Sequence, residues 1–263
     1  MKKLMFAMLA AAVAAGSALA QVAGVATTTD NRQLKGTFKW RERDKSYVFV
    51  QEGKNVEVAL PGSQIKSINV PQPPALAAAI NQIKNGNPQA AIPDLEKVAA
   101  GYVRLNWDEV ATRYLAEAYL KADNVDKTLE VCEKVIKSNP AAAYSGDCAP
   151  FYWKALLKKG RNSTVEELAE KAIQETDRTT SAFAHLVRGD VILAGGDTPA
   201  LARKALRDGY LRVVLLYQNV AEAQPEALYK AAQCFEKMSQ SGRADKMRTK
   251  LKDSYPDSEW AKK

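Results

Sequence analysis

The chain carries few residues that could perform catalysis, and their spacing does not assemble a known active site. His185 is the single histidine, and it lies in the apolar stretch SAFAHLVRG. A catalytic histidine needs an orienting carboxylate and usually a nucleophile within reach, and no G-x-S-x-G or H-E-x-x-H motif accompanies it. We therefore expect His185 to pack inside a helix, and the sequence predicts no catalytic residue, no metal site and no cofactor.

The three cysteines are Cys132, Cys148 and Cys234, and their spacings match no zinc pattern. Cys132 and Cys148 are expected in neighbouring helices. In an oxidising compartment, where disulfides persist, a bridge between them is one alternative. The other is that each cysteine is a small buried hydrophobe in an apolar helix. The sequence leaves both alternatives open.

The first 20 residues, MKKLMFAMLAAAVAAGSALA, have the pattern of a secretory signal peptide. Lys2 and Lys3 precede an apolar run, and Ala18-Leu19-Ala20 forms an A-x-A cleavage signal. The apolar run is shorter than the roughly 20 residues that span a membrane. We expect cleavage near Ala20-Gln21, no transmembrane anchor afterwards, and a soluble protein in the bacterial periplasm or secreted from the cell.

The formal net charge is +8, and the two lysines of the expected signal peptide contribute to it. A mild positive excess could favour anionic surfaces, although an ordinary solvated surface explains it equally well. No run of lysines and arginines with interleaved aromatics indicates nucleic-acid binding. We therefore expect no nucleic-acid partner.

Residues 34–70 show the two-residue alternation of β-strands. In LKGTFKW, Leu34, Phe38 and Trp40 share one face, and three further stretches read as strands between turn residues: SYVFVQ, VEVAL and QIKSINV. The sequence therefore predicts a small antiparallel β-module at 34–70, preceded by a flexible leader at 21–33. So small a sheet needs further structure packed against it to be stable.

From residue 75 to residue 263 the apolar spacing is helical. Polar or glycine-containing breaks divide this region into helix pairs, at Asn85-Gly86-Asn87, Asp123-Asn124, Gly160-Arg161-Asn162 and Gly195-Gly196-Asp197, and a fifth pair spans 225–256. The first helices align on one position, occupied by Ala79, Ala116, Trp153, Gly189 and Ala232. A small residue there lets two helix backbones approach closely, and an aromatic residue one turn later, such as Tyr119 or Phe235, fills the space where they diverge.

This order of small, aromatic and proline positions resembles the tetratricopeptide-repeat (TPR) superfamily over residues 75–263. The second unit matches the signature at Leu115, Ala116, Tyr119, Thr128, Cys132 and Pro140, and the last unit at Ala231, Ala232, Phe235, Ala244 and Pro256. Trp153 departs from the pattern because a small residue is usual there, and Arg248 stands where an apolar one is expected. The last unit, ALYKAAQCFEKM with the later YPDSEWAKK, is similar to repeats of bacterial envelope proteins such as the Tol-associated cell-division coordinator. The lipoproteins of outer-membrane β-barrel assembly carry similar repeats.

The resemblance implies a mostly α fold, a TPR-like α-solenoid of about five helical hairpins preceded by the small antiparallel β-module. It also implies a concave face, lined by the first helix of each pair, that binds a protein or peptide partner of the cell envelope. The positions that carry over are Arg113, Glu117, Lys121, Lys154, Lys158, Asp190, Tyr229 and Gln233. Lysine and arginine there could bind carboxylates, whereas each residue taken singly could equally be an ordinary exposed one.

Two functions follow from these patterns. The first is a non-enzymatic periplasmic scaffold for protein–protein interaction, in envelope assembly or maintenance. The alternative is an envelope carbohydrate- or peptidoglycan-binding protein, or an enzyme, with its site near the β-module. Trp40, Tyr47 and Phe49 motivate the alternative because exposed aromatic rings can stack on sugars, but the same residues could form the core of the sheet. The sequence decides neither the partner nor the oligomeric state.

Overall fold

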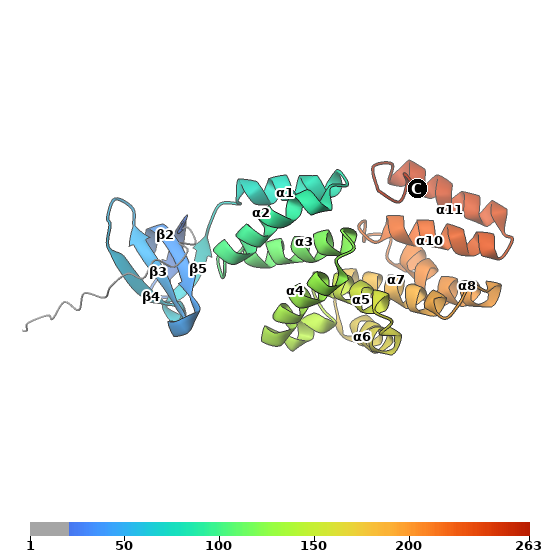
Figure 1. The fold of residues 1–263 in the computed structure, drawn as a ribbon, viewed down its shortest axis with the longest axis horizontal. Helices are drawn as coiled ribbons and strands as arrows, with labels where there is room; N and C mark the ends of the chain where they lie inside the picture. Colours follow the sequence, from blue (N-terminus) through green and yellow to red (C-terminus); the bar gives the residue numbers. More distant parts are fainter. Residues whose placement is uncertain (1–20) are drawn as a thin grey trace, which may run out of the picture. The chain divides into compact units, whose positions relative to one another are not determined.

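The computed structural model describes residues 21–263, and the expected signal peptide lies outside the described residues. Two compact units are present (Figure 1). The sheet unit consists of residues 21–72 and Lys97–Asp108, and the helical unit of Pro73–Glu96 and Glu109–Lys263. Within the described residues, helices paired in hairpins follow an antiparallel sheet, which confirms the fold class predicted from the sequence.

The sheet contains five strands within the described residues, in the order β4-β3-β2-β1-β5 with every neighbouring pair antiparallel. The strands are β1 (Val22–Thr28), β2 (Gln33–Arg41), β3 (Ser46–Gln51), β4 (Glu57–Pro61) and β5 (Ile65–Asn69). Phe38 and Phe49 pack ring to ring in its core, with centroids 4.9 Å apart. The four strands expected within 34–70 are therefore present.

The expectation of a flexible leader at 21–33 is wrong for residues 22–28, which form β1 between β2 and β5. The small residues of VAGVATT are typical of a linker, but here they are small because the paired strands β2 and β5 lie close to them. Ala26 is fully buried. A Cβ atom on Gly24 would lie 2.8 Å from the carbonyl oxygen of Asn69 on β5, so this strand has no room for a larger side chain.

Residues 97–108 pack with the sheet, although the sequence placed all of 75–263 in the helical repeats. Leu105 is fully buried in the core of the sheet unit. The indole nitrogen of Trp107 donates to the carbonyl oxygen of Val70 at 2.8 Å, and the side-chain amide of Asn106 donates to that of Ile68 at 2.6 Å. This segment supplies the additional packing that so small a sheet requires.

The helical unit consists of hairpins at the predicted places. The pairs are α1 (Pro74–Lys84) with α2 (Pro88–Gly101), α3 (Asp108–Lys121) with α4 (Val125–Ser138), and α5 (Ala149–Lys158) with α6 (Asn162–Glu175). In the fourth, α7 (Arg178–Ala194) pairs with a run made of α8 (Pro199–Ala205), the π-helical segment η4 (Leu206–Tyr210) and α9 (Leu211–Leu216). The last pair is α10 (Gln224–Lys237) with α11 (Ser241–Ser254).

The turns between paired helices use residues that tolerate left-handed backbone geometry. Gly86 and Gly160 have φ values of 81° and 71°, and Asp123 has a φ of 58°. The side chain of Asn124 accepts a hydrogen bond from the amide of Lys127 and so caps α4. These local choices end one helix and begin the next, which explains why the breaks are readable in the sequence.

Trp153 occupies a position where the other first helices carry a small residue, and it is fully buried. The connection before α5 is long enough to include a short 3-10 turn, η3 (Pro140–Ala143). The indole nitrogen of Trp153 donates to the carbonyl oxygen of Ala143 in that turn at 2.8 Å. The longer connection thus gives the large ring both space and a hydrogen-bond acceptor.

Helix α7 and the π-helical segment η4 cross in direct backbone contact. A Cβ atom built on Gly189 would lie 2.5 Å from the ring of Tyr210, and one on Gly209 would lie 2.8 Å from the backbone of Gly189. Glycine is therefore required on both sides of the crossing.

We expect Gly189→Ala to lower the free energy of unfolding by about 1–3 kcal/mol, because the added methyl group must displace the buried ring of Tyr210. Urea denaturation followed by circular dichroism measures the change. Gly242→Ala in α11 is the matched control, since its Cβ would meet nothing within 4 Å. Equal stability of the two variants would show that the crossing has room to relax.

Candidate protein-interaction surface

The first helices of four hairpins meet through charged side chains. Arg113 of α3 pairs with Glu117 at 3.1 Å, and Glu117 pairs in turn with Lys121 at 3.3 Å. The guanidinium of Arg113 also lies 5.3 Å from the ring centroid of Phe151 on α5. The three α3 residues expected to bind a partner therefore form one row of alternating charge.

Helices α5, α7 and α10 are joined by a network of ion pairs centred on Lys230. Its ammonium group lies 2.7 and 2.8 Å from the two carboxylate oxygens of Asp190 and 2.6 Å from Glu226. The other oxygen of Glu226 accepts from Lys154 at 2.6 Å, and the hydroxyl of Tyr210 donates to Asp190 at 2.8 Å. We call these five residues the Lys230 network.

The Lys230 network is largely removed from solvent, which shifts its pKa values strongly. The side chain of Glu226 is only 7% exposed. Burial alone would raise the pKa of Glu226, but the charges of Lys154 and Lys230 outweigh it and lower the pKa to about 2. Burial would likewise lower the pKa of Lys230, but Glu226 and Asp190 raise it above its usual range. Glu226 and Lys230 are therefore both charged at neutral pH.

The sequence singled out Lys154 and Asp190 but missed Glu226, Lys230 and Tyr210. Glu226 and Lys230 are four residues apart on one helix, which is also the spacing of an ordinary solvated pair. Their partners Lys154 and Asp190 come from α5 and α7, and such long-range pairing leaves no local signal in the sequence. Lys154 and Asp190 consequently stabilise the helix stack itself.

The remaining predicted residues lie at the surface or beneath the end of the chain. Lys158 is half exposed and pairs with Asp123 at 2.6 Å, and Gln233 is exposed. Lys121 pairs with Glu259 at 3.0 Å, and the ring of Tyr229 lies 5.3 Å from that of Trp260. The eight predicted residues thus divide into internally paired, exposed, and covered groups.

All three cysteines are free thiols in the structure. The thiol of Cys132 in α4 donates to the carbonyl oxygen of Cys148, the residue before α5, at 3.9 Å. The hydrogen bond between the two side chains, together with burial, raises the pKa of Cys132, and the same hydrogen bond lowers the pKa of Cys148. Cys132 is buried whereas Cys148 is only partly buried, so Cys148 is the thiol that a dissolved disulfide can reach first.

We expect oxidised glutathione to convert Cys132 and Cys148 into a disulfide. The Cys148 thiolate attacks the glutathione disulfide and releases one glutathione thiolate; the deprotonated sulfur of Cys132 then attacks the mixed disulfide and releases the second. Peptide mapping by mass spectrometry without reduction detects the bridge. Cys132→Ser should stop at a mixed disulfide on Cys148, and a native protein that forms neither product would contradict this order of reaction.

The single histidine and the potential metal-ligating side chains are the other candidate sites for chemistry. His185 is buried, its Nδ1 lies 3.4 Å from the carbonyl oxygen of Asp208, and burial lowers its pKa to about 4. Among residues 21–263, no group of three or more His, Cys, Asp or Glu side chains is arranged to hold a metal ion.

The aromatic residues behind the carbohydrate-binding hypothesis do not form an exposed platform. Tyr47 and Phe49 are buried in the core of the sheet unit. Trp40 is partly buried, packs edge-on against Tyr47, and carries the guanidinium of Arg104 at 4.9 Å from its ring centroid. Sugar stacking would need a ring face that these contacts cover.

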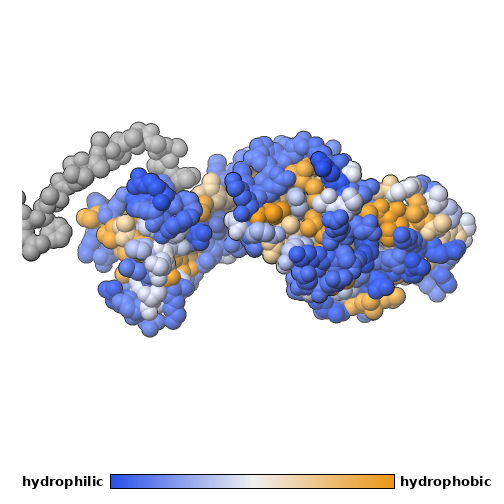
Figure 2. All heavy atoms as spheres, turned by 90° about the horizontal axis from the view of Figure 1, so that it is seen from below, coloured by the Kyte–Doolittle hydropathy of each residue, from blue (hydrophilic) through white to orange (hydrophobic). Residues whose placement is uncertain are grey.

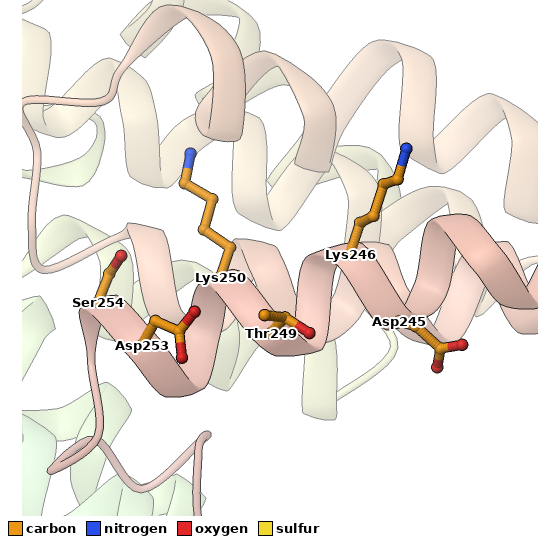
Figure 3. A pocket seen from close by; sticks show the side chains of 6 residues that line it. All are labelled: Asp245, Lys246, Thr249, Lys250, Asp253 and Ser254. Carbon is orange, nitrogen blue, oxygen red and sulfur yellow. The ribbon is translucent and has the colours of Figure 1, made fainter.

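One shallow depression lies on α11, at the surface of the last hairpin. Its lining residues all come from that helix: Asp245, Lys246, Thr249, Lys250, Asp253 and Ser254. Figure 3 shows Lys246 and Lys250 extending away from Asp245 and Asp253. These charged and hydroxyl-bearing side chains make this face of α11 polar.

The face of the molecule drawn in Figure 2 is mainly hydrophilic, with apolar areas interspersed over both units. Scattered apolar area is normal for a folded protein. No helix among residues 21–263 has the length and apolar character needed to cross a membrane.

Comparison with known proteins identifies the last hairpin. Residues 226–258 match the family model described as a tetratricopeptide repeat, so the chain contains a tetratricopeptide repeat formed by α10 and α11. The chain is similar to the crystal structure of TTC0263, a thermophilic TPR protein in Thermus thermophilus, with 20% sequence identity and a TM-score of 0.47. That similarity covers 69% of this chain and 90% of the other. No curated protein matches the chain.

Proposed function

We propose that the protein is a non-enzymatic scaffold of the bacterial cell envelope that binds a protein or peptide partner on the first helices of its repeats. In this proposal the N-terminal 20 residues direct export and are removed, and the protein acts in the periplasm in envelope assembly or maintenance. No cofactor takes part.

The observation that supports the proposal is that the first helices of separate hairpins carry charged side chains that are at least partly exposed. Arg113, Glu117 and Lys121 form a row along α3, and Lys158 extends the basic character onto α5. Partly exposed cations can exchange an internal carboxylate for one on a partner at little cost, since such surface ion pairs contribute only about 0–1 kcal/mol. A tetratricopeptide repeat is a module that typically binds proteins.

In-cell photo-crosslinking tests the proposal. A photoreactive amino acid at Lys158 or at Gln233 should give a covalent adduct with a discrete envelope protein, identified by mass spectrometry. Lys134 on α4 is the matched control, since it is an exposed lysine on a second helix. Adducts that are absent, or equally frequent from Lys134, would contradict binding on the first helices.

The charge requirement has its own test. Lys158→Glu should reduce the adduct formed from Gln233, because a partner carboxylate would lose its cation. Lys154 is unsuitable for this purpose because it holds the buried carboxylate of Glu226.

Export has a separate test. Sequencing the N-terminus of the protein from a periplasmic fraction should give a chain that starts at Gln21.

A further inference from the structure

The chain after α11 does not leave the helical unit but folds back onto it. Residues 255–263, here called the return segment, are fixed by local turns in which the amide of Ser258 donates to Tyr255 and that of Ala261 to Ser258. Tyr255, Trp260 and Ala261 pack against the core of the last two hairpins. The return segment is therefore an ordered part of the fold.

An acidic residue of the return segment reaches the second hairpin. The carboxylate of Glu259 lies 3.0 Å from the ammonium group of Lys121, at the end of α3. Both side chains remain partly exposed, at 51% for Glu259 and 32% for Lys121. A pair so open to water is weak and can exchange its acidic member.

The next residue, Trp260, contacts side chains of helix α10. The ring of Trp260 lies 5.3 Å from the ring of Tyr229, and the ammonium group of Lys230 lies 5.8 Å from the Trp260 ring centroid. The ammonium group of Lys263 lies 3.7 Å from the same centroid. Aromatic stacking and cation–π contacts of this kind are those by which a helical surface holds an aromatic side chain of a peptide.

Two of the residues expected to bind a partner, Lys121 and Tyr229, are thus occupied by the chain itself. Both contacts are made by side chains: the carboxylate of Glu259 pairs with Lys121, and the indole ring of Trp260 packs on the ring of Tyr229. Any peptide with glutamate followed by tryptophan could therefore make them. We propose that Lys121, Tyr229 and Lys230 form a docking site for a peptide with an acidic residue followed directly by tryptophan, which the return segment fills in cis. This inference rests on the proposed function and adds the chemistry of the partner.

The cis arrangement determines how the site must be tested. A segment tethered to its own site competes at an effective concentration on the order of 1 mM, so added peptide binds weakly while the return segment is intact. Weakening Glu259 and Trp260 removes this competitor and leaves Lys121, Tyr229 and Lys230 in place.

The probe is a fluorescently labelled peptide, SYPDSEWAKK, which copies residues 254–263 and has blocked ends. It is titrated by fluorescence anisotropy into the wild type, into Glu259→Ala/Trp260→Ala, and into Glu259→Lys. We expect the double variant to bind the peptide at least about tenfold more tightly than the wild type does. Glu259→Lys, which keeps the tryptophan, should show a smaller gain and decides the question if the double variant fails to fold.

Charge reversal supplies the specificity control. Adding Lys121→Glu to the double variant should abolish binding, and a peptide whose glutamate is replaced by lysine should restore it. Equal binding to wild type and variants, or binding that ignores Lys121→Glu, would overturn the docking site. Such a result leaves adducts from Lys158 or Gln233 unaffected, so it is distinguishable from a failure of the proposed function.

Discussion

Replacing Lys230 by methionine is expected to lower the free energy of unfolding by about 3–5 kcal/mol. Lys230 neutralises Asp190 and Glu226 together, and its loss leaves the buried carboxylate of Glu226 and the partly buried one of Asp190 with one remaining cation, Lys154. Methionine has a similar length, so the change removes charge and hydrogen bonds more than volume. Urea denaturation at neutral pH measures the loss.

The control for this prediction is Lys127→Met, which removes an exposed lysine from its pair with Glu130 at 2.7 Å. That pair is open to solvent, so its loss should change the free energy of unfolding far less than the loss of Lys230 does. Combining Lys230→Met with Asp190→Asn and Glu226→Gln should recover part of the stability, because amides carry no uncompensated charge. If the triple variant were as unstable as the single one, repulsion between the carboxylates would not be the cause.

The pH dependence of the same comparison follows from the depressed pKa of Glu226. Because its folded-state pKa of about 2 lies below its ordinary value of 4.5, the ionised carboxylate stabilises the wild type fully above pH 4.5. This contribution disappears as the pH falls from 4.5 towards 2. The difference in stability between wild type and Lys230→Met should therefore narrow over that interval, and a difference that is constant with pH would contradict the charge assignment.

Trp153→Ala is expected to lower the free energy of unfolding by about 3–5 kcal/mol, because it leaves a cavity where the buried indole was. The indole packs among Leu156, Val165 and Val187. Trp153→Phe keeps most of this packing and leaves only the carbonyl of Ala143 without its donor, so it should cost clearly less. Thermal unfolding of both variants gives the comparison, and equal losses would assign the effect to the hydrogen bond.

The hairpins could be predicted from the sequence because their signals are local. Gly86, Asp123 and Gly160 adopt left-handed geometry within the turns, and Asn124 and Thr198 cap the helices that follow. Each of these residues acts on backbone a few positions away. The small residues Ala116 and Ala232 could also be recognised in the sequence, because four of the five hairpins carry a small residue at that position and only Trp153 departs from it.

The candidate site was harder to predict because its arrangement depends on residues far apart in the chain. Nothing near Lys121 indicates that Glu259 will pair with it, and nothing near Glu226 indicates that Lys154 of α5 will pair with it. The strand β1 was missed for a related reason. Its alternation is weak because Gly24 must be small where Asn69 of β5 approaches it, and β5 lies far from β1 along the sequence.

The segment 97–108 has a practical consequence for dissecting the protein. Leu105 and Trp107 complete the interior of the sheet unit, yet they are encoded between α2 and α3. Cutting the polypeptide between β5 and α1 would leave the N-terminal piece without these two core side chains and would expose them to water in the C-terminal piece. Limited proteolysis should therefore release neither piece in a folded form. An isolated sheet unit would have to include residues 97–108 fused to the strands.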